Sequence, residues 1–238
     1  MSAIFRRIGQ PEPAPPWGFF TAVNTTVAAL VAIALLGTTI AFVLFPDLTF
    51  VFLVGWALGA ALTIAYVNFS RRNQQAALNL EPRSSRLFLV LLFGFGVAMA
   101  IDAVGLFASG LFLPTPELAY LLSARDNLIG WVVAGAFILF LQPMAEQLVF
   151  SGVFYPAAQQ ALGGWGGYGV TVMVFGLFHY LVYGYPPENG LWPALIVPLL
   201  SGLNIIGARA STGSTRAAIA AQMGFGLFAL VKLLVLPM

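Results

Sequence analysis

The sequence has no cysteine, one histidine and few charged residues, and these shortages exclude several classes of protein. Without cysteine there is no disulfide framework, no thiolate metal site and no cysteine nucleophile. Of the 238 residues, 60% are hydrophobic and only 8% are charged, a balance that excludes a soluble globular protein. The net charge of +2 comes from loop arginines rather than from a basic face, so we expect no nucleic-acid partner.

The chain consists largely of apolar runs about 20 residues long, which is the length a helix needs to cross a bilayer. Helices satisfy their own backbone hydrogen bonds where no water is available. The short alternating segments of an outer-membrane barrel are not found. The sequence therefore predicts an all-α, polytopic transmembrane helical bundle with about seven to eight spans, and the lipid bilayer is its first partner.

Seven spans can be placed from the apolar runs and the polar segments between them. They cover roughly residues 24–45, 48–69, 87–113, 127–161, 168–185, 191–206 and 217–236. Pro143 interrupts the fourth helix, and Pro193 and Pro198 are expected to kink the sixth. Gly55 and Gly59 have the GxxxG spacing that lets a neighbouring helix approach closely.

The basic residues gather in segments that fall on one side of this arrangement. The N-terminal arm and residues 71–86 and 209–216 together carry eight of the ten. By the positive-inside rule, we place these segments in the cytoplasm and Glu188 outside. The first residues lack the pattern of a cleaved signal peptide, so we treat the N-terminus as mature. We expect an integral protein of a bacterial-type plasma membrane, with a cytoplasmic arm (1–23), N-terminal helices (24–125) and a C-terminal core (126–238).

Two ionisable side chains lie inside the apolar stretch from Leu141 to Tyr180. They are Glu146 and His179, on two helices joined by a glycine-rich turn at Gly163 to Gly167. Placing a charged group in a bilayer costs about 3 kcal/mol, so a functional role is the default interpretation. On adjacent antiparallel helices the pair could share a water, with Glu146 as general base and His179 orienting the water or protonating a leaving amine.

Other interpretations of the buried polar residues remain open. Glu146 could bind backbone groups freed by Pro143, and His179 could donate to a carbonyl or ligate a tetrapyrrole metal. One histidine and one glutamate are too few for a zinc site with three protein ligands, so we assign no metal and leave the cofactor unknown. Asp102, deep in the third span, could be satisfied by Ser109 or by a tyrosine on a neighbouring helix.

Three segments of the C-terminal half match a known set of motifs. They read AEQLVFSGVFYPAAQQ, VFGLFHYL and GARASTGSTRAAIAAQMGFGLFAL. Over Asp126 to Leu234 they resemble the CPBP family, meaning the CAAX prenyl protease type 2 and bacteriocin-processing (Abi) membrane proteins. That family carries a Glu-Glu-x-x-x-Arg motif, a Phe-x-x-x-His motif and a His-x-x-x-Asn-like motif. Its active members look like glutamate-dependent intramembrane endopeptidases.

Part of the family pattern is present. The resemblance aligns Glu146 with the glutamate that activates water, and it aligns Phe175 and His179 with the whole second motif. Gln222 stands at the histidine position of the third motif, where it could supply one donor to an oxyanion. The resemblance therefore implies Glu146, His179 and Gln222 as the candidate catalytic residues.

Four positions depart from the pattern. Gln147 and Ser151 replace the second glutamate and the arginine, while Gln222 and Gly226 replace the histidine and the asparagine. Losing one oxyanion donor lowers a rate by about 10²–10³, and losing the arginine removes a fixed charge beside the carboxylates. We expect Gln222→His with Gly226→Asn to raise activity most.

The favoured interpretation is a weakly active or catalytically silent relative, a pseudoenzyme that serves as a membrane scaffold or as a subunit of a membrane complex. The alternative is an active intramembrane endopeptidase that cleaves a CAAX-like or leader peptide. The partner is accordingly a membrane protein or a membrane-associated peptide. A transporter has less support because the sequence shows no internal repeat.

Overall fold

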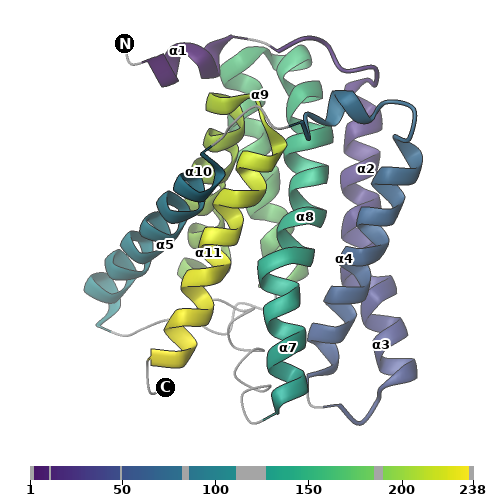
Figure 1. Cartoon of the computed structure of the whole chain (residues 1–238), viewed down its shortest axis with the longest axis vertical. Helices are drawn as coiled ribbons and strands as arrows, with labels where there is room; N and C mark the ends of the chain where they lie inside the picture. Colours follow the sequence, from purple (N-terminus) through teal and green to yellow (C-terminus); the bar gives the residue numbers. More distant parts are fainter. Residues whose placement is uncertain are drawn as a thin grey trace.

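The computed structural model describes residues 3–10, 12–48, 50–81, 86–110, 127–184 and 190–235. In these ranges all regular structure is helical, and the long helices run side by side with α1 across one end (Figure 1). The predicted all-α transmembrane bundle is confirmed. The α-helices are α1 (Ala3–Gly9), α2 (Phe19–Val31), α3 (Thr38–Leu44), α4 (Val51–Ser70), α5 (Leu87–Ser109), α7 (Leu128–Ala136), α8 (Gln142–Gln147), α9 (Tyr155–Val182), α10 (Val197–Thr212) and α11 (Thr215–Val235).

Short π-helical segments extend several of these helices without a break. They are η1 (Ala32–Gly37), η3 (Phe137–Leu141), η4 (Leu148–Phe154) and η5 (Trp192–Ile196). The last three are each followed two residues later by a proline, namely Pro143, Pro156 and Pro198. A proline ring clashes with the preceding turn and donates no hydrogen bond, and the wider π turn accommodates both effects. The predicted interruption at Pro143 is therefore a change of helical register within a continuous helix.

Six continuous helical segments are long and apolar enough to cross a membrane. Five correspond to single predicted spans, but Leu128–Val182 has 55 residues and would measure roughly 80 Å if straight. It reverses at Gly163, whose φ of 75° and ψ of 172° suit glycine and not a helix. The rings of Phe150 and Phe175, one from each arm, lie 5.3 Å apart. The two arms therefore match the predicted fourth and fifth spans, and the turn is at one glycine rather than five residues.

Glycines allow two pairs of helices to pack with their backbones in contact. A Cβ atom added to Gly59 of α4 would lie 2.5 Å from the carbonyl oxygen of Ala32, and Gly55 makes a similar approach to α3. The GxxxG spacing thus does bring α4 against η1 and α3. Gly94 and Gly224 bring α5 and α11 together in the same way. An added Cβ atom on Gly94 would lie 2.3 Å from the carbonyl oxygen of Ala221, and one on Gly224 would lie 2.2 Å from that of Leu91. The α5–α11 contact forms one wall of the cavity described below.

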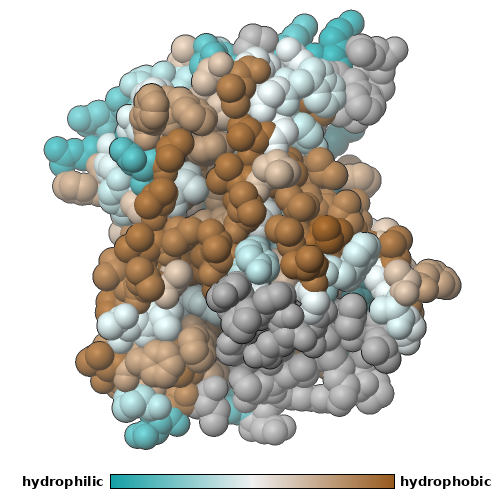
Figure 2. All heavy atoms as spheres, turned by 180° about the vertical axis from the view of Figure 1, so that it is seen from behind, coloured by the Kyte–Doolittle hydropathy of each residue, from teal (hydrophilic) through white to brown (hydrophobic). Residues whose placement is uncertain are grey.

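The surface has the distribution expected of a bilayer protein. Hydrophobic side chains cover the middle of the face in Figure 2, and hydrophilic side chains gather toward the two ends. Exposed apolar residues include Phe93 on α5 and Phe107 near its end, which are 66% and 90% exposed. Apolar side chains are stable in contact with lipid, whereas their exposure to water costs free energy. The chain is accordingly an integral membrane protein.

Several predicted span boundaries differ from the structure, and the first span begins at Phe19 rather than near Asn24. α5 ends at Ser109 and is capped by Gly110 in the left-handed conformation, before the predicted end at Leu113, which lies outside the described residues. α10 continues to Thr212 instead of stopping at Ile206. The continuation of α10 places an arginine that was expected in a loop inside the bundle.

Candidate active site

The predicted pair face each other across the helical hairpin. Glu146 lies on α8 and His179 on the returning arm of α9, and the distance from Nε2 of His179 to Oε2 of Glu146 is 3.4 Å. Gln222 of α11 reaches the same carboxylate, because its Nε2 donates to Oε2 at 2.6 Å. All three side chains are buried. The structure thus brings together the three residues that the sequence analysis singled out.

Tyr183 completes the surroundings of the carboxylate. Its hydroxyl donates to Oε1 of Glu146 at 3.0 Å, and its ring packs edge-on against Trp56. No sequence signal marks this residue, because a tyrosine near the end of a span is usual at a membrane interface. Glu146 is therefore held by side chains from the hairpin and α11. Among the described residues, no hydrogen bond links Glu146 to backbone groups freed by Pro143.

The two ring nitrogens of His179 contact different groups. Its Nδ1 lies 3.2 Å from the carbonyl oxygen of Phe175, which can only accept, so Nδ1 carries a hydrogen. Its Nε2 faces Oε2 of Glu146 at 3.4 Å. Both ring nitrogens are engaged, which argues against a tetrapyrrole ligand. Among the described residues no three His, Cys, Asp or Glu side chains gather to hold a metal.

A chain of buried hydrogen bonds leads to Glu146 from the first arm of the hairpin. Ser151 Oγ donates to Gln147 Oε1, and Gln147 Nε2 donates to Gln222 Oε1, both at 2.6 Å. Gln222 then donates to Glu146. Each donor fixes the orientation of the next amide, and successive bonds polarise one another. The residues that replace the family's second glutamate and arginine therefore help to position Gln222.

Arg209 brings a positive charge close to Ser151. It was expected in a cytoplasmic loop, but it lies in α10 with a fully buried side chain, and its Nε donates to the Ser151 carbonyl oxygen at 3.0 Å. Its terminal nitrogens donate to the two carboxylate oxygens of Glu12 at 2.5 and 2.6 Å. A buried arginine is stable only with such a partner. The charge absent at position 151 is thus supplied by another helix and neutralised by the N-terminal segment.

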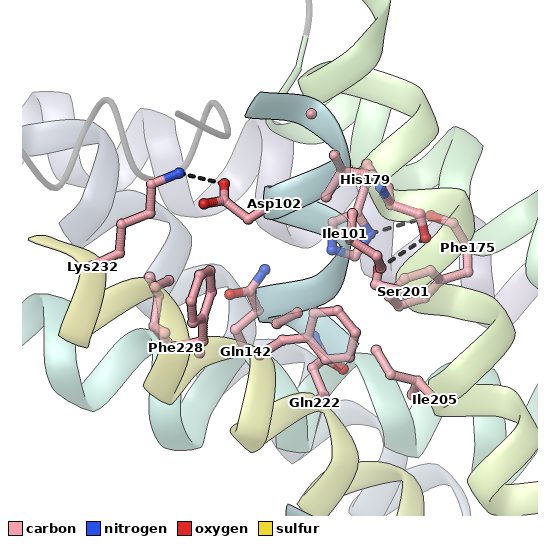
Figure 3. A pocket seen from close by; sticks show the side chains of 18 of the residues that line it. Ile101, Asp102, Gln142, Phe175, His179, Ser201, Ile205, Gln222, Phe228 and Lys232 are labelled. Atoms are coloured by element: carbon pink, nitrogen blue, oxygen red, sulfur yellow. Dashed lines mark hydrogen bonds and ion pairs between the residues drawn. The ribbon is translucent and has the colours of Figure 1, made fainter. Parts of the chain in front are cut away.

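A cavity of about 140 Å³ lies beside these residues, lined by α5, α10 and α11 among others (Figure 3). His179, Gln222, Gln142 and Ser201 contribute polar groups to its wall, whereas Glu146 does not line it. The remaining wall is mostly apolar. A dry cavity of about 150 Å³ is large enough for a benzene molecule. This one therefore suits a small apolar group presented to the imidazole and the amides.

An ion pair forms another part of the cavity wall. Lys232 of α11 and Asp102 of α5 make a salt bridge, visible in Figure 3. The prediction that Ser109 or a tyrosine satisfies Asp102 is wrong, since the Ser109 hydroxyl donates to the Gly105 carbonyl oxygen. Sequence spacing could not show the pair, because its members are 130 residues apart.

The packing around Gly226 contradicts another expectation. A Cβ atom at this position would lie 2.6 Å from Cγ2 and 2.7 Å from the carbonyl oxygen of Ile138. A backbone oxygen cannot move aside as a side-chain tip can, so an asparagine here would force α11 away from η3. Gly226→Asn is therefore not the activating substitution that the sequence suggests.

Comparison with known proteins gives one match. Residues 127–228 match a family model described as Type II CAAX prenyl endopeptidase Rce1-like. The matched stretch runs from the start of α7 into α11 and includes Glu146, His179 and Gln222. No curated protein and no solved structure matches the chain. The predicted resemblance to the CPBP family is confirmed for this part of the chain.

Proposed function

Since residues 127–228 match the Rce1-like family model, we propose that this membrane protein is a weakly active or catalytically silent relative that serves as a membrane scaffold or as a subunit of a membrane complex by binding a membrane peptide or protein. One observation carries the proposal. The Glu146 carboxylate accepts from Tyr183 and Gln222, its Oε2 lies 3.4 Å from Nε2 of His179, and it does not line the cavity. A carboxylate that activates water must reach that water. In this arrangement each of its two oxygens accepts from a protein donor.

The third motif supports the same conclusion. Gln222 directs its Nε2 to Glu146 and accepts from Gln147 with its Oε1, so one of its two N–H donors and its carbonyl oxygen are engaged by the protein. Gly226 contributes no donor at the position of the family's asparagine. Because each absent oxyanion donor costs about 10²–10³ in rate, a tetrahedral intermediate would receive little stabilisation here.

The cavity supports a binding role. Its wall is mostly apolar, with a few convergent polar groups and the Lys232–Asp102 pair, which is the usual composition of a ligand site. Its lining residues come from membrane-crossing helices. A ligand that already lies in the bilayer, such as a prenylated or leader peptide or a helix of a membrane complex, can present a small apolar group to it.

Endopeptidase activity is the second candidate, and a different observation favours it. His179 and Gln222 line the cavity next to Glu146, and Nε2 of His179 lies 3.4 Å from the Glu146 carboxylate. If Tyr183 or Gln222 released the carboxylate, Glu146 could take a proton from a water and His179 could protonate the leaving amine.

A combined binding and cleavage assay distinguishes the two candidates. The purified chain in nanodiscs would be titrated with a fluorescent farnesylated CAAX peptide, with anisotropy reporting binding and mass spectrometry reporting products. We expect saturable binding and no more product than Glu146→Ala gives. Turnover that disappears in Glu146→Ala would establish the endopeptidase, and a lack of saturable binding would refute a role in binding prenylated peptides.

We also propose that the N-terminus faces the cytoplasm of a cell with a bacterial-type plasma membrane. The support is the arginine asymmetry of the sequence. The predicted external residue Glu188 lies outside the described residues. Labelling at two described positions, Asp47 and Asn73, tests the orientation instead.

A further inference from the structure

Arg209 is a permanently charged group inside the bundle. Its side chain is fully buried, and its guanidinium lies 5.4 Å from the ring centre of Tyr155. Arginine does not deprotonate in proteins, so this charge cannot be removed by giving up a proton. An anionic partner is therefore needed whenever the bundle is folded.

Glu12 supplies that partner through a paired contact. Its two carboxylate oxygens accept from the two terminal nitrogens of Arg209 at 2.5 and 2.6 Å. Its backbone is held as well, because its N–H donates to Gln159 Oε1 at 3.4 Å and its carbonyl oxygen accepts from Gln160 Nε2 at 2.7 Å. The groups that hold Glu12 all belong to α9 and α10. They form a receptor into which a carboxylate is placed by a separate segment.

That segment is the N-terminal arm, which we define as the described residues between 3 and 18. Its helix α1 lies across the end of the bundle and contacts α9 and α10 (Figure 1). The contact with α9 is backbone to backbone, since a Cβ atom on Gly164 would lie 2.5 Å from the carbonyl oxygen of Ile8. Arg7 donates to the Thr212 carbonyl oxygen at 3.2 Å. The arm thus rests on the bundle, with Glu12 directed inward.

A second cavity, of about 410 Å³, adjoins the receptor. Glu12 lines it together with Arg7, Gln10 and Gln159, but Arg209 does not. Glu12 therefore adjoins both the cavity and the guanidinium. Removing it would connect the polar cavity to Arg209.

We propose that Arg209 is the centre of a carboxylate-binding site, that Glu12 is its resident ligand, and that the carboxylate of another molecule takes its place when Glu12 is withdrawn. The two parallel N–H groups of an arginine match the planar oxygen pair of a carboxylate. The third donor, Nε, is held by the Ser151 carbonyl oxygen, which fixes the plane of the guanidinium. Ser151 also begins the chain of hydrogen bonds to Glu146, so the site is connected to the candidate active site through Ser151 and Gln147.

Chemical rescue tests the proposal with Glu12→Ala in detergent. We expect this variant to lose at least about 5 °C in Tm, because a buried charge has lost its partner. Sodium acetate at about 100 mM should restore at least half of the loss, while sodium chloride at equal ionic strength should not. The wild type should shift by less than about 1 °C. The double variant Glu12→Ala with Arg209→Met should not respond to acetate, because it lacks the charge.

Further arms exclude the remaining explanations. If Glu12→Ala cannot be purified, Glu12→Gln is scored in the same way, and a yield that depends on acetate counts as rescue. No effect of acetate on either single variant, or an equal effect on the double variant, would overturn the proposal. Rescue by phosphatidylglycerol nanodiscs but not by acetate would identify a phosphate site and would also refute a carboxylate site.

Discussion

At the scale of single residues, the centre of this protein is a carboxylate whose hydration has been replaced by side chains. The phenol of Tyr183 and the amide of Gln222 donate to Glu146, and the imidazole of His179 lies beside it. The Glu146 side chain is fully buried. Each donor offsets part of the cost of removing the carboxylate from water. The same donors occupy the lone pairs that catalysis would require. One set of contacts therefore stabilises the bundle and opposes hydrolysis.

The first prediction concerns the phenol. Tyr183→Phe removes one donor to Glu146 without changing the packing of the ring against Trp56, and should lower the free energy of unfolding by about 1–3 kcal/mol. Tyr66→Phe is the matched control, because Tyr66 is 45% exposed and should change stability by less than about 0.5 kcal/mol. Thermal or denaturant unfolding in one detergent measures both. Equal stability of the two variants would show that the bond to Glu146 contributes nothing.

The second prediction concerns the chain of amides. Gln147→Glu restores the family's second glutamate but replaces the donor to Gln222 Oε1 with an acceptor, and we expect a loss of at least about 2 kcal/mol. Adding Gln222→His provides a donor at that contact. The double variant should then be more stable than the sum of the single effects by more than about 1 kcal/mol. Additive losses would mean that the two side chains are not coupled.

At the scale of helices, the positions of the spans could be predicted because each apolar run must match the bilayer. The reversal of the hairpin was marked by glycines, and Gly163 alone makes it. The π turns before Pro143, Pro156 and Pro198 could not be predicted, because the choice between a kink and a change of register depends on packing against neighbouring helices. The end of α10 was missed because an arginine is typical of a loop, and the sequence does not show that Glu12 pairs with Arg209 inside the bundle.

The third prediction tests the close packing of α11. Gly226→Ala introduces a Cβ atom 2.7 Å from the carbonyl oxygen of Ile138 and should cost about 1–3 kcal/mol. Gly96→Ala, in the interior of α5, meets nothing within 4 Å and should be neutral or slightly stabilising. Unfolding of the two variants in the same detergent provides the comparison. A neutral Gly226→Ala would show that α11 can move, and Gly226→Asn would again be a candidate activating change.

At the scale of the whole molecule, the residues that pair across the bundle are the ones that the sequence could not connect. Glu146 and His179 were found because they are ionisable groups in an apolar stretch, and Gln222 because a family motif marks its position. Lys232 and Asp102 are separated by 130 residues, and Arg209 and Glu12 by 197. No local pattern relates charges at such distances, since their pairing is decided by how the helices pack.

The last prediction concerns orientation. Arg7 and Asn79 line the same cavity, so the N-terminal arm and the segment after α4 lie at one end of the bundle. Asp47 precedes α4, whose 20 residues span about 30 Å, so it lies at the other end. Because the sequence has no cysteine, Asn73→Cys and Asp47→Cys, both at exposed positions, each introduce a single thiol. The arginine asymmetry predicts that an impermeant maleimide labels Asp47→Cys in intact cells and Asn73→Cys only after permeabilisation. The reverse pattern would place the Glu12–Arg209 site outside the cell, where only external carboxylates could reach it.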